Sequence, residues 1–411
     1  MDSYVFSSHM KREESETVFW DSANNSGKAM LRSLFAPGSR VACYSQMSSI
    51  PGPICRKFVP VEQSEISSIG KHDAFKFRLV SYNILAQAYV KSSYFPHSPA
   101  PCLKWKARSQ AVLTVLKNLE ADFLCLQEVD EYDSFYKKNM ESLGYASIYI
   151  QRSGKKRDGC GIFYKQNKYA ELVIEEKIDY NDLVDTVGDP KTSSVDKDNK
   201  AQVGEIKEES KADINQKDSQ VDRGDPNDPR VRFKRDCVGI MAAFRLDNPT
   251  CQHIIIANTH LYWDPEWADV KISQAKYLLS RLSGFKKLVS NKFDCSPSII
   301  VTGDFNSVPG DQVYQYLVSG ANLVGPETVD DNLPIPLSSV YAYTKGEPEF
   351  TNCTPGFTGT LDYILFSPSS DIKPVSYLEL PGSESSDVRG GLPNYFHPSD
   401  HLPIGAEFEV L

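Results

Sequence analysis

The amino-acid sequence predicts an α/β protein in which two packed β-sheets lie between outer helices, and three observations lead to this fold class. Strand-like apolar segments recur from about residue 75 to the end of the chain. Only a few helix-like segments stand between them. The composition, 40% hydrophobic and 24% charged, is that of an ordinary globular protein. Many strands with few interspersed helices are typical of two sheets packed face to face with the helices outside.

The strands are predicted from hydrophobic periodicity. In 75–84, FKFRLVSYNI, apolar and polar residues alternate, and 121–129, ADFLCLQEV, is the continuous apolar run of a strand buried on both faces. The same two patterns predict further strands at 159–165, 237–246, 253–261, 298–305, 360–367, 375–380 and 404–410. A strand in the last position would tie the end of the chain into a sheet.

Helical spacing marks two longer segments. In 104–119 one face carries apolar residues at helical intervals, and in 267–289 an apolar face opposes a basic one. The basic face of the second segment is formed by Lys271, Lys276, Arg281, Lys286 and Lys287. A third, shorter helix-like run follows Pro309. The amphipathic pattern places these helices outside the sheets.

Residues 1–70 lack a sustained periodic pattern and are predicted to be a disordered N-terminal extension. The stretch from Met30, MLRSLFAPGSRVACYSQMSS, is basic, serine-rich and free of acidic residues, which is the composition of an organellar transit peptide. The acidic run KREESE ahead of it favours the alternative, an ordinary disordered tail. The expected localisation is the cytoplasm, the nucleus or both, with the mitochondrion or chloroplast as the alternative that residues 30–70 raise.

Residues 181–229 are predicted to be a disordered acidic insertion within a folded domain that spans 71–411. The insertion holds 13 acidic and 7 basic residues and no aromatic residue, so it cannot bury enough apolar surface to offset the entropy lost on ordering. It carries most of the chain's net charge of −9. That charge excludes a globally basic nucleic-acid binder and is compatible with a local basic groove.

Cysteine spacing and hydropathy exclude several protein classes. The nine cysteines are scattered, odd in number and never form a C-x-x-C pair, so neither a disulfide framework nor a structural zinc site is predicted. This pattern fits a reducing compartment. No apolar run approaches the length of about 18 residues that spans a membrane, and no membrane association is expected.

Polar side chains stand where the predicted strands end or begin. They are Asn83, Gln127, Glu128, Asn258, His260, Asp304, Asn306, Asp362, Asp400 and His401. A turn accounts for any one of them, but strand ends on one rim of a sandwich converge, so these groups can share one cleft. Converging carboxylates repel each other unless a cation joins them. Because the set offers oxygen ligands and no thiolate, it predicts Mg²⁺, with Mn²⁺ as the alternative.

An acid and a histidine form the next predicted unit. Asp362 lies inside an apolar strand pattern and needs a polar partner there. His401 is predicted to be that partner, since a histidine that activates water or takes up phosphate charge needs an orienting carboxylate. Asp400 would then face the metal.

In chain order, the motifs SYNIL, LQEV, THLYWDP, TGDFNSVP, GTLDYI and SDHLPI resemble the signature segments of the exonuclease/endonuclease/phosphatase superfamily. The resemblance covers about 75–411 apart from the insertion. Within the superfamily, NILAQ, DGCGIFYK and HLYWDPEWADVKISQAK are most similar to the carbon catabolite repressor protein 4 group of poly(A)-specific 3′ exoribonucleases. Nocturnin and the 2′,5′-phosphodiesterases are close relatives of that group. The sequence lacks the leucine-rich repeat that yeast-type deadenylases carry before the nuclease domain.

The resemblance implies a four-layer α/β sandwich, the endonuclease/exonuclease/phosphatase fold, for a nuclease domain over 71–411. It also implies a metal bound by Glu128, with Asp400 as a second acid of the metal site. The implied catalytic residues orient water and phosphate or stabilise charge, and they are Asn83, His260, Asp304, Asn306, Asp362 and His401. Asp304 is the best general base among them.

The resemblance places substrate recognition on loops. An adenine would stack on Pro265 and on the ring of Phe357, with Asn306 alongside. Trp263, in the same motif as Pro265, is expected to pack in the core. Four basic residues precede the DGC motif and would bind RNA phosphates or form a solvated loop: Arg152, Lys155, Lys156 and Arg157.

The implied function is that of a Mg²⁺-dependent 3′-to-5′ exoribonuclease that shortens mRNA poly(A) tails and releases 5′-AMP. The implied partners are the poly(A) 3′ end of RNA and the subunits of a deadenylase complex. The alternatives are a nocturnin-type 2′-phosphatase of NADPH, a 2′,5′-phosphodiesterase and, from another class, an inactive scaffold that binds RNA or proteins. The complete set of acids, asparagines and histidines favours an enzyme.

Overall fold

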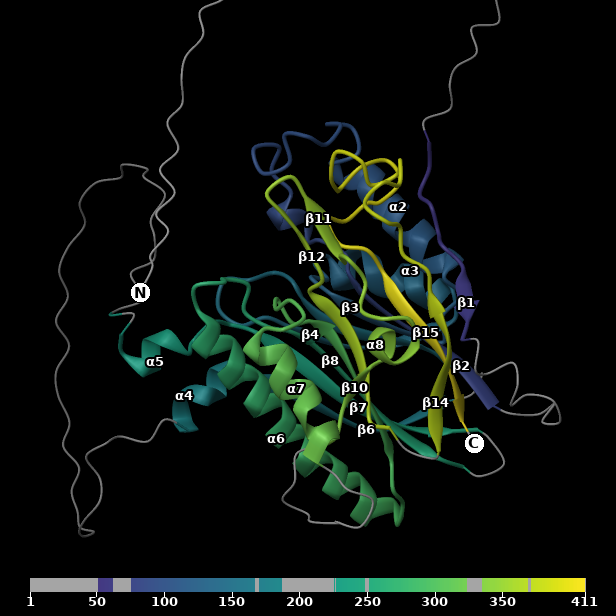
Figure 1. Cartoon of the computed structure of the whole chain (residues 1–411), viewed down its shortest axis with the longest axis vertical. Helices are drawn as coiled ribbons and strands as arrows, with labels where there is room; N and C mark the ends of the chain where they lie inside the picture. The colour runs from purple at the N-terminus through teal and green to yellow at the C-terminus, as the bar shows by residue number, and fades with distance from the viewer. Residues whose placement is uncertain are drawn as a thin grey trace, which may run out of the picture. The chain divides into compact units, whose positions relative to one another are not determined.

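Two β-sheets packed face to face form the centre of the fold, and helices cover their outer faces (Figure 1). The computed structural model describes residues 51–61, 75–166, 170–186, 225, 227–247, 251–323, 335–368 and 371–410. All of them belong to one unit of the chain, 50–411. The predicted fold class, a four-layer α/β sandwich, is confirmed.

The first sheet has seven strands in the order β1-β14-β15-β2-β3-β5-β4. Their bounds are Phe58–Pro60 (β1), Ile372–Leu378 (β14), Ile404–Val410 (β15), Phe75–Asn83 (β2), Phe123–Gln127 (β3), Gly159–Lys165 (β5) and Tyr145–Gln151 (β4). Strands β2 and β3 are parallel, and the other neighbours are antiparallel. The last strand, β15, pairs with β14 on one side and β2 on the other, so the end of the chain is tied into the sheet as predicted.

The second sheet has six strands in the order β10-β13-β9-β8-β7-β6. Their bounds are Ser338–Ser339 (β10), Asp362–Phe366 (β13), Ser298–Asp304 (β9), His253–His260 (β8), Val238–Leu246 (β7) and Ala170–Asp179 (β6). Strands β8 and β9 are parallel, and the other neighbours are antiparallel. A separate short hairpin joins Asn352–Thr354 (β11) to Phe357–Gly359 (β12).

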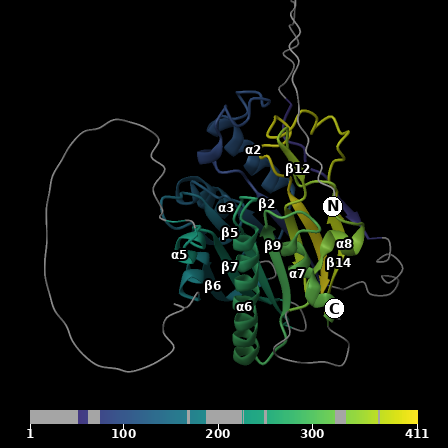
Figure 2. The same cartoon turned by 60° about the vertical axis from the view of Figure 1, so that its left-hand side comes forward.

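The longer helices form the two outer layers. The helix bounds are Trp105–Asn118 (α2), Lys137–Ser142 (α3), Leu183–Thr186 (α4), Pro229–Arg232 (α5), Ala268–Phe293 (α6), Gln312–Leu323 (α7) and Val340–Thr344 (α8), with short turns at Gln87–Tyr89 (η1), Tyr132–Tyr136 (η2) and Tyr180–Asp182 (η3). α2 and α3 pack on the first sheet, whereas α6 and α7 pack on the second (Figure 2). In the part of the chain that the structure describes, none of these helices combines the length and the apolar composition needed to span a lipid bilayer.

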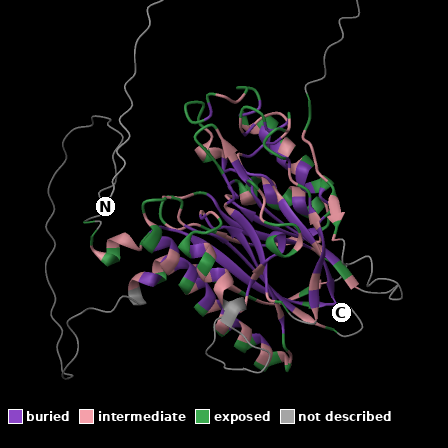
Figure 3. Ribbon diagram, viewed as in Figure 1, coloured by how far each residue is buried: buried purple, intermediate pink, exposed green. Residues whose placement is uncertain are grey.

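Apolar cores separate the four layers. Along β2, Phe77 and Leu79 lie between the two sheets, whereas Val80 and Tyr82 pack against the α2 side, as the two-residue period of a strand requires. Both faces of the central strands are therefore covered, and the continuous apolar runs of the sequence follow from this. In Figure 3 the buried residues accordingly concentrate in the strands, and the exposed ones lie on loops and outer helix faces.

The predicted strands and helices are present, with ends shifted by a few residues; β14, for example, begins at Ile372 instead of 375. The sequence patterns do not predict β4 and β6. In β4, small Ala146 and Ser147 interrupt the apolar pattern, and β6 is an edge strand that carries Glu171 and Glu175. Edge strands need less apolar sequence because only part of their surface is buried.

Part of the predicted N-terminal extension is ordered. Strand β1 lies within 1–70 and pairs with β14, and Arg56 ahead of it contacts the carboxylate of Asp387 at 2.8 Å. The ordered domain therefore begins before residue 71. Three residues of strand and one ion pair leave no periodic signal in a sequence, which explains the missed boundary. Residues 1–50 and 62–74, with most of the predicted transit peptide, lie outside the described residues.

The predicted acidic insertion is also ordered at both edges. Asn181 donates from Nδ2 to Ser153 Oγ at 2.7 Å and to Asp236 Oδ1 at 3.1 Å. At the other edge, Asp228 Oδ1 accepts from the Arg230 backbone N–H at 2.9 Å and caps α5. The boundaries 181 and 229 are therefore too wide. Residues 187–224 and 226 lie outside the described residues.

Candidate active site

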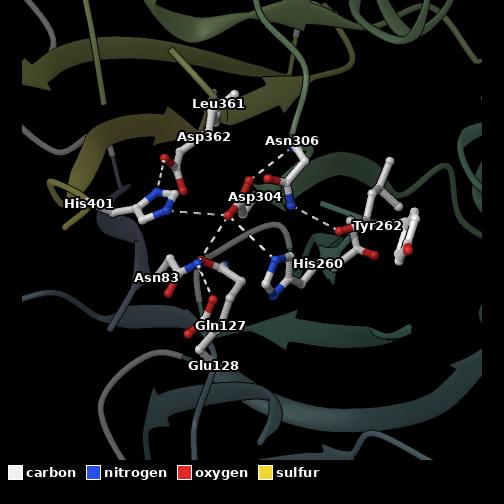
Figure 4. A network of polar contacts seen from close by, with 12 residues as sticks. Asn83, Gln127, Glu128, His260, Tyr262, Asp304, Asn306, Leu361, Asp362 and His401 are labelled. Carbon is white, nitrogen blue, oxygen red and sulfur yellow. Dashed lines mark hydrogen bonds and ion pairs between the residues drawn. The ribbon is translucent and has the colours of Figure 1, made fainter. Parts of the chain in front are cut away.

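The strand register brings polar residues from both sheets to one rim (Figure 4). Strands β2 and β3 are parallel, so their C-terminal ends place Asn83 and Glu128 side by side. Strands β8 and β9 are parallel as well, and His260 is in register with Asp304. The antiparallel pairing of β13 with β9 sets Asp362 opposite Asp304. Three strand pairings thus account for five of the predicted site residues.

Asn83 links the two sheets. Its Nδ2 donates to Glu128 Oε1 at 3.1 Å and to Asp304 Oδ2 at 3.0 Å, and its Oδ1 accepts from the Leu85 backbone N–H at 3.0 Å. The side chain is fully buried. Because both ends of the amide are bonded, its orientation is fixed, and one nitrogen holds two carboxylates in place.

The carboxylate of Asp304 is the centre of the network, and only 1% of the residue is exposed. Besides the bond from asparagine, Oδ2 lies 3.5 Å from His260 Nε2 and 3.6 Å from His401 Nε2. Oδ1 accepts from the Asn306 backbone N–H at 2.9 Å. Burial raises the pKa of Asp304, and the charge of Asp362 raises it further, whereas His401 and His260 lower it by less. A carboxyl group whose pKa is raised accepts a proton more readily at neutral pH.

The two histidines differ in charge. His401 Nδ1 lies 2.8 Å from Asp362 Oδ2. Burial works against a charged ring at His401, but the charges of Asp362 and Asp304 prevail and raise its pKa well above the ordinary value. At His260 burial prevails and lowers the pKa in spite of Asp304. The site therefore holds an imidazolium at His401, oriented by the predicted acid, and a neutral imidazole at His260.

Glu128 stands among other carboxylates. It follows β3 in the left-handed region, with φ of 57°, and its Oε2 accepts from the Ala86 backbone N–H at 2.9 Å. Burial, followed by the charges of Asp158 and Asp400, raises the pKa of Glu128 to about 7. Burial is the larger cause of this shift and the neighbouring carboxylates add to it, and a bound cation would lower the pKa again.

This set of donors fits a divalent cation. In the described part of the chain, one group of three acids and histidines has ligand atoms that all lie within 4.8 Å of one another, and its members are Asp304, Asp362 and His401. The charged ring of His401 has a proton on each nitrogen and offers no lone pair to a metal. Glu128 and Asp400, whose carboxylates are not paired with a histidine, are therefore the residues that would hold the cation. Oxygen ligands without thiolate suit Mg²⁺ or Mn²⁺.

A run of short contacts fixes the Asp400 segment. Ser399 Oγ donates to the backbone oxygen of Asn83 at 2.7 Å and accepts from the His401 N–H at 3.2 Å. The backbone oxygen of Asp400 accepts from the Cys353 N–H at 3.1 Å. These contacts join the residues just ahead of β15 to the end of β2, which explains why an acid and a histidine stand together there.

Asn306 lies beside the Asp304 carboxylate on the loop after β9. Its φ is 48°, again in the left-handed region, which asparagine tolerates better than most residues. Its Nδ2 donates to the Leu261 backbone oxygen at 3.0 Å. This bond fixes the orientation of the amide and leaves Oδ1 and the second Nδ2 hydrogen to meet other groups.

The aromatic residues near this loop are exposed. Phe357 on β12 is 42% exposed, and a Cβ added at Gly359 would lie 2.9 Å from its ring and 3.4 Å from Val308 Cγ1. The ring thus lies close to the loop that carries Asn306. Pro265 is exposed on the loop after β8. The expectation that Trp263 packs in the core is wrong: the residue is 63% exposed, because it lies beyond the end of β8.

Two polar residues of the predicted cleft lie inside the sandwich instead. Gln127 Nε2 donates to Asn258 Oδ1 at 2.7 Å, and Asn258 Nδ2 donates to the backbone oxygens of Leu126 and Gly161 at 3.0 and 2.9 Å. Both side chains are fully buried. They cross-link the two sheets beneath the site, because the polar pattern of a strand end does not reveal which side chains turn inward.

The basic residues before the DGC motif include a largely buried one and exposed ones. Arg152 is largely buried, donates to the backbone oxygen of Asp236 at 3.0 Å and pairs with Asp158 at 3.5 Å. Lys155 and Arg157 are exposed and are the ones free to meet a phosphate. Arg152 serves the fold and offsets part of the negative charge at the site.

Sequence patterns do not reveal three other polar residues of the site. Asp158 is 1% exposed and accepts from the Tyr89 hydroxyl at 2.6 Å. Thr351 Oγ1 donates to Asp362 Oδ2 at 2.6 Å, the oxygen that also faces His401. The only sequence feature that points to Asp158 as a site residue is its place directly before a predicted strand. No sequence feature points to Thr351.

The fold and this cluster define a class of protein, the metal-dependent phosphoester hydrolases built on two packed sheets. A model of the Endonuclease/Exonuclease/phosphatase family matches residues 80–401, and the chain belongs to this family. It is 57% identical over 404 residues to carbon catabolite repressor protein 4 homolog 4 of Arabidopsis thaliana, which covers 89% of this chain and 94% of the relative.

More distant relatives share the same domain. The identity to the CCR4-Not complex 3′-5′-exoribonuclease subunit Ccr4 of Schizosaccharomyces pombe is 29% over 402 residues, with 86% of this chain and 52% of that subunit covered. The chain thus spans about half the length of this fungal relative. Among solved structures, ANGEL2, described as a 2′,3′-cyclic phosphatase, has a TM-score of 0.61 and 27% identity, and covers 87% of this chain and 99% of its own. The human nocturnin catalytic domain, with a TM-score of 0.55, 21% identity and coverages of 87% and 98%, shares the fold.

Proposed function

We propose that this chain is a divalent-metal-dependent 3′-to-5′ exoribonuclease that removes adenosine nucleotides from poly(A) tails and releases 5′-AMP. The observation that carries the proposal is the joined cluster around Asp304, whose carboxylate contacts residues from three other strand ends or loops. Similarity over nearly the whole length of the Arabidopsis relative, and to fungal subunits described as 3′-5′-exoribonucleases, supports RNA as the substrate. Deadenylase-complex subunits are proposed partners on the same similarity.

Hydrolysis needs a water molecule positioned in line with the phosphorus and a group that takes its proton. Asp304 would take that proton, because its carboxylate is buried, has a raised pKa and faces the rim. Asn83 keeps the carboxylate from turning away, since its Nδ2 bonds Oδ2 from the opposite sheet. The Asn306 N–H fixes the other oxygen.

Negative charge develops on the phosphoryl oxygens and needs donors that are already in place. His401, oriented and kept charged by Asp362, would donate from Nε2. His260 would donate as a neutral ring. A cation bound at Glu128 and Asp400, Mg²⁺ or alternatively Mn²⁺, would neutralise the non-bridging and leaving oxygens.

The Asn306 amide favours particular bases. Because Nδ2 is bonded to Leu261, the amide offers the acceptor Oδ1. An acceptor binds the exocyclic amino group at C6 of adenine or C4 of cytosine and rejects the carbonyl oxygen that guanine or uracil carries at the same position. Stacking on the exposed ring of Phe357 and on Pro265 would add about 1–3 kcal/mol per base without selecting its hydrogen bonds. The two effects together favour a 3′-terminal adenosine.

A second candidate function is hydrolysis of 2′,3′-cyclic phosphates at RNA ends, which the similarity to ANGEL2 supports. A nocturnin-type 2′-phosphatase of NADPH has less support. Its support is the nocturnin catalytic domain, which at 21% identity shares the fold alone. A 2′,5′-phosphodiesterase would use the same catalytic residues and differs only in how the ribose is held.

The test uses RNAs that share one 5′-labelled body and differ in a short homopolymer tail of A, C or U. With Mg²⁺, the A tail should shorten stepwise from the 3′ end and release 5′-AMP, with C next and U slowest. Chelation of the metal should stop the reaction. Equal rates on the three tails would remove the proposed selection by Asn306, and no release of nucleotides from any tail would remove the exoribonuclease itself.

A further inference from the structure

We propose that Lys271 and Gln274, on the buried face of α6, are positioning residues that hold two substrate loops in their working geometry. The substrate loops are 261–267, after β8, and 305–309, after β9. The inference rests on the role proposed above for Asn306. α6 covers the outer face of the second sheet, and through these two residues it would also act indirectly in catalysis.

Lys271 departs from the pattern of its helix. The sequence places it on the basic, exposed side of 267–289, but only 5% of the residue is exposed. Its Nζ donates to the backbone oxygen of Asn306 at 2.8 Å. Among the described residues, no carboxylate pairs directly with the ammonium; burial lowers its pKa, and the charges of Asp311, Asp264 and Asp304 act only from a distance.

A buried ammonium that donates to a backbone oxygen is an expensive way to stabilise a fold, because the charge loses its hydration. An apolar side chain of similar length would fill the same space at less cost. What the ammonium adds is a strong, directed bond to one particular oxygen. The structure therefore assigns Lys271 the role of fixing the position of the Asn306 backbone, and not that of stabilising the fold.

The oxygen in question belongs to a backbone that needs support. Asn306 has a φ of 48°, and a side-chain-bearing residue stays in this sparsely populated region only when its surroundings hold it. Three hydrogen bonds hold Asn306 in place. Its N–H donates to Asp304, its Nδ2 donates to Leu261, and its backbone oxygen accepts from Lys271. Without the last, the following peptide can rotate, and the amide that faces the substrate turns with it.

Gln274 makes the matching contact to the other loop. It lies one turn after Lys271 on the same helix face, is fully buried, and its Oε1 accepts from the Tyr262 backbone N–H at 2.9 Å. The Asn306–Leu261 bond then joins the two loops to each other. α6 is itself anchored in the core by its apolar residues, so it serves as a rigid reference for both loops.

The experiment compares Lys271→Met with Lys276→Met, which removes an exposed lysine from the same helix. Lys271→Met should lower kcat by about 10- to 100-fold, the effect of a small misplacement of reacting groups, and should do so both on poly(A) RNA and on the base-free diester bis(p-nitrophenyl) phosphate. KM for the base-free diester and Tm should stay close to the wild-type values, with Tm within about 4 °C. Lys276→Met should match the wild type. If Lys271→Met does not fold, Lys271→Gln replaces it with the same expectations.

A cycle with Asn306→Ala shows whether Lys271 acts through Asn306. Lys271→Met alone should lower the ratio of turnover on A tails to turnover on U tails. In the Asn306→Ala background it should change that ratio by less than about twofold, since the side chain that selects the base is gone. Calorimetry with 5′-AMP in the presence of EDTA gives a readout without metal, and Lys271→Met should weaken this binding about tenfold through the misplaced amide. Gln274→Leu should raise KM for RNA and leave the base-free diester unchanged.

Losses of selectivity for A tails over U tails that multiply in the cycle, or a normal kcat with a lowered Tm, would overturn the proposal. A wild-type protein that hydrolyses the base-free diester and leaves RNA intact would instead overturn the exoribonuclease function. In that case the Lys271 comparisons on the diester still decide the positioning role.

Discussion

Replacing Asp362 with asparagine removes one charge from its buried pair with His401 and preserves the size of the side chain. The two residues meet at 2.8 Å, and both are almost fully buried. A hydrogen bond to a charged group contributes about 1.5–3 kcal/mol. If the charged ring is needed only in the transition state, kcat should fall by about 10- to 150-fold, at about 1.4 kcal/mol per factor of ten. Thr351 Oγ1 can still donate to the amide oxygen, so the fold should persist.

The assay is single-turnover hydrolysis of poly(A) RNA at saturating metal by Asp362→Asn, His401→Ala and the double variant. Because the two residues act as one unit, the double variant should be no slower than the slower single variant. Asp294→Asn is the matched control, since Asp294 precedes β9 at the end opposite Asp304, and it should keep full activity. A double variant that shows the product of the two single losses would refute the pair.

Three further perturbations test other parts of the account. In metal-free protein, the pKa of Glu128 is about 7 in the folded state against an ordinary 4.5, so the folded state binds a proton across this window that the unfolded state releases. The free energy of unfolding should therefore fall by up to about 3 kcal/mol as pH rises from 4.5 to 7. This fall should be smaller in Glu128→Gln, which should also lose at least about 100-fold in turnover. Equal pH profiles of wild type and variant in calorimetry would contradict the raised pKa of Glu128. Phe357→Ala should weaken RNA binding by about 1–3 kcal/mol, measured by fluorescence titration, and leave the base-free diester unaffected; equal losses on both substrates with a lower Tm would mean that the ring supports the fold. Deleting 187–224 and joining its flanks with a short flexible linker should leave Tm and kcat nearly unchanged, and a variant that fails to fold would show that the segment packs on the domain.

The part of the site that lies on strands could be predicted from the sequence. Hydrophobic periodicity fixes where strands end, and sheet geometry then brings Asn83, Asp304 and Asp362 to one rim. The same periodicity does not fix which way a polar end residue turns. Gln127 and Asn258 carry the same signal and bond to each other between the sheets.

Contacts between segments that are distant in the sequence could not be predicted. Tyr89 and Asp158 are 69 residues apart in the chain, and no sequence pattern in either segment predicts that they form a hydrogen bond. Lys271 follows the helical pattern of exposed basic residues and is buried because the substrate loops cover the first turns of α6. Such contacts depend on how the loops pack on the two folded sheets, and local sequence patterns do not predict this packing.

We propose above that this site hydrolyses the 3′-terminal phosphodiester of poly(A). The most direct measurement is a competition in which purified protein and Mg²⁺ meet equal amounts of poly(A) RNA, RNA ending in a 2′,3′-cyclic phosphate, 2′,5′-linked oligoadenylate and NADPH in ¹⁸O-labelled water, with products identified by mass spectrometry. We expect poly(A) to be consumed first and each released 5′-AMP to carry one ¹⁸O on its phosphate, since water attacks phosphorus. Preferential opening of the cyclic phosphate or loss of phosphate from NADPH, with poly(A) left intact, would contradict it.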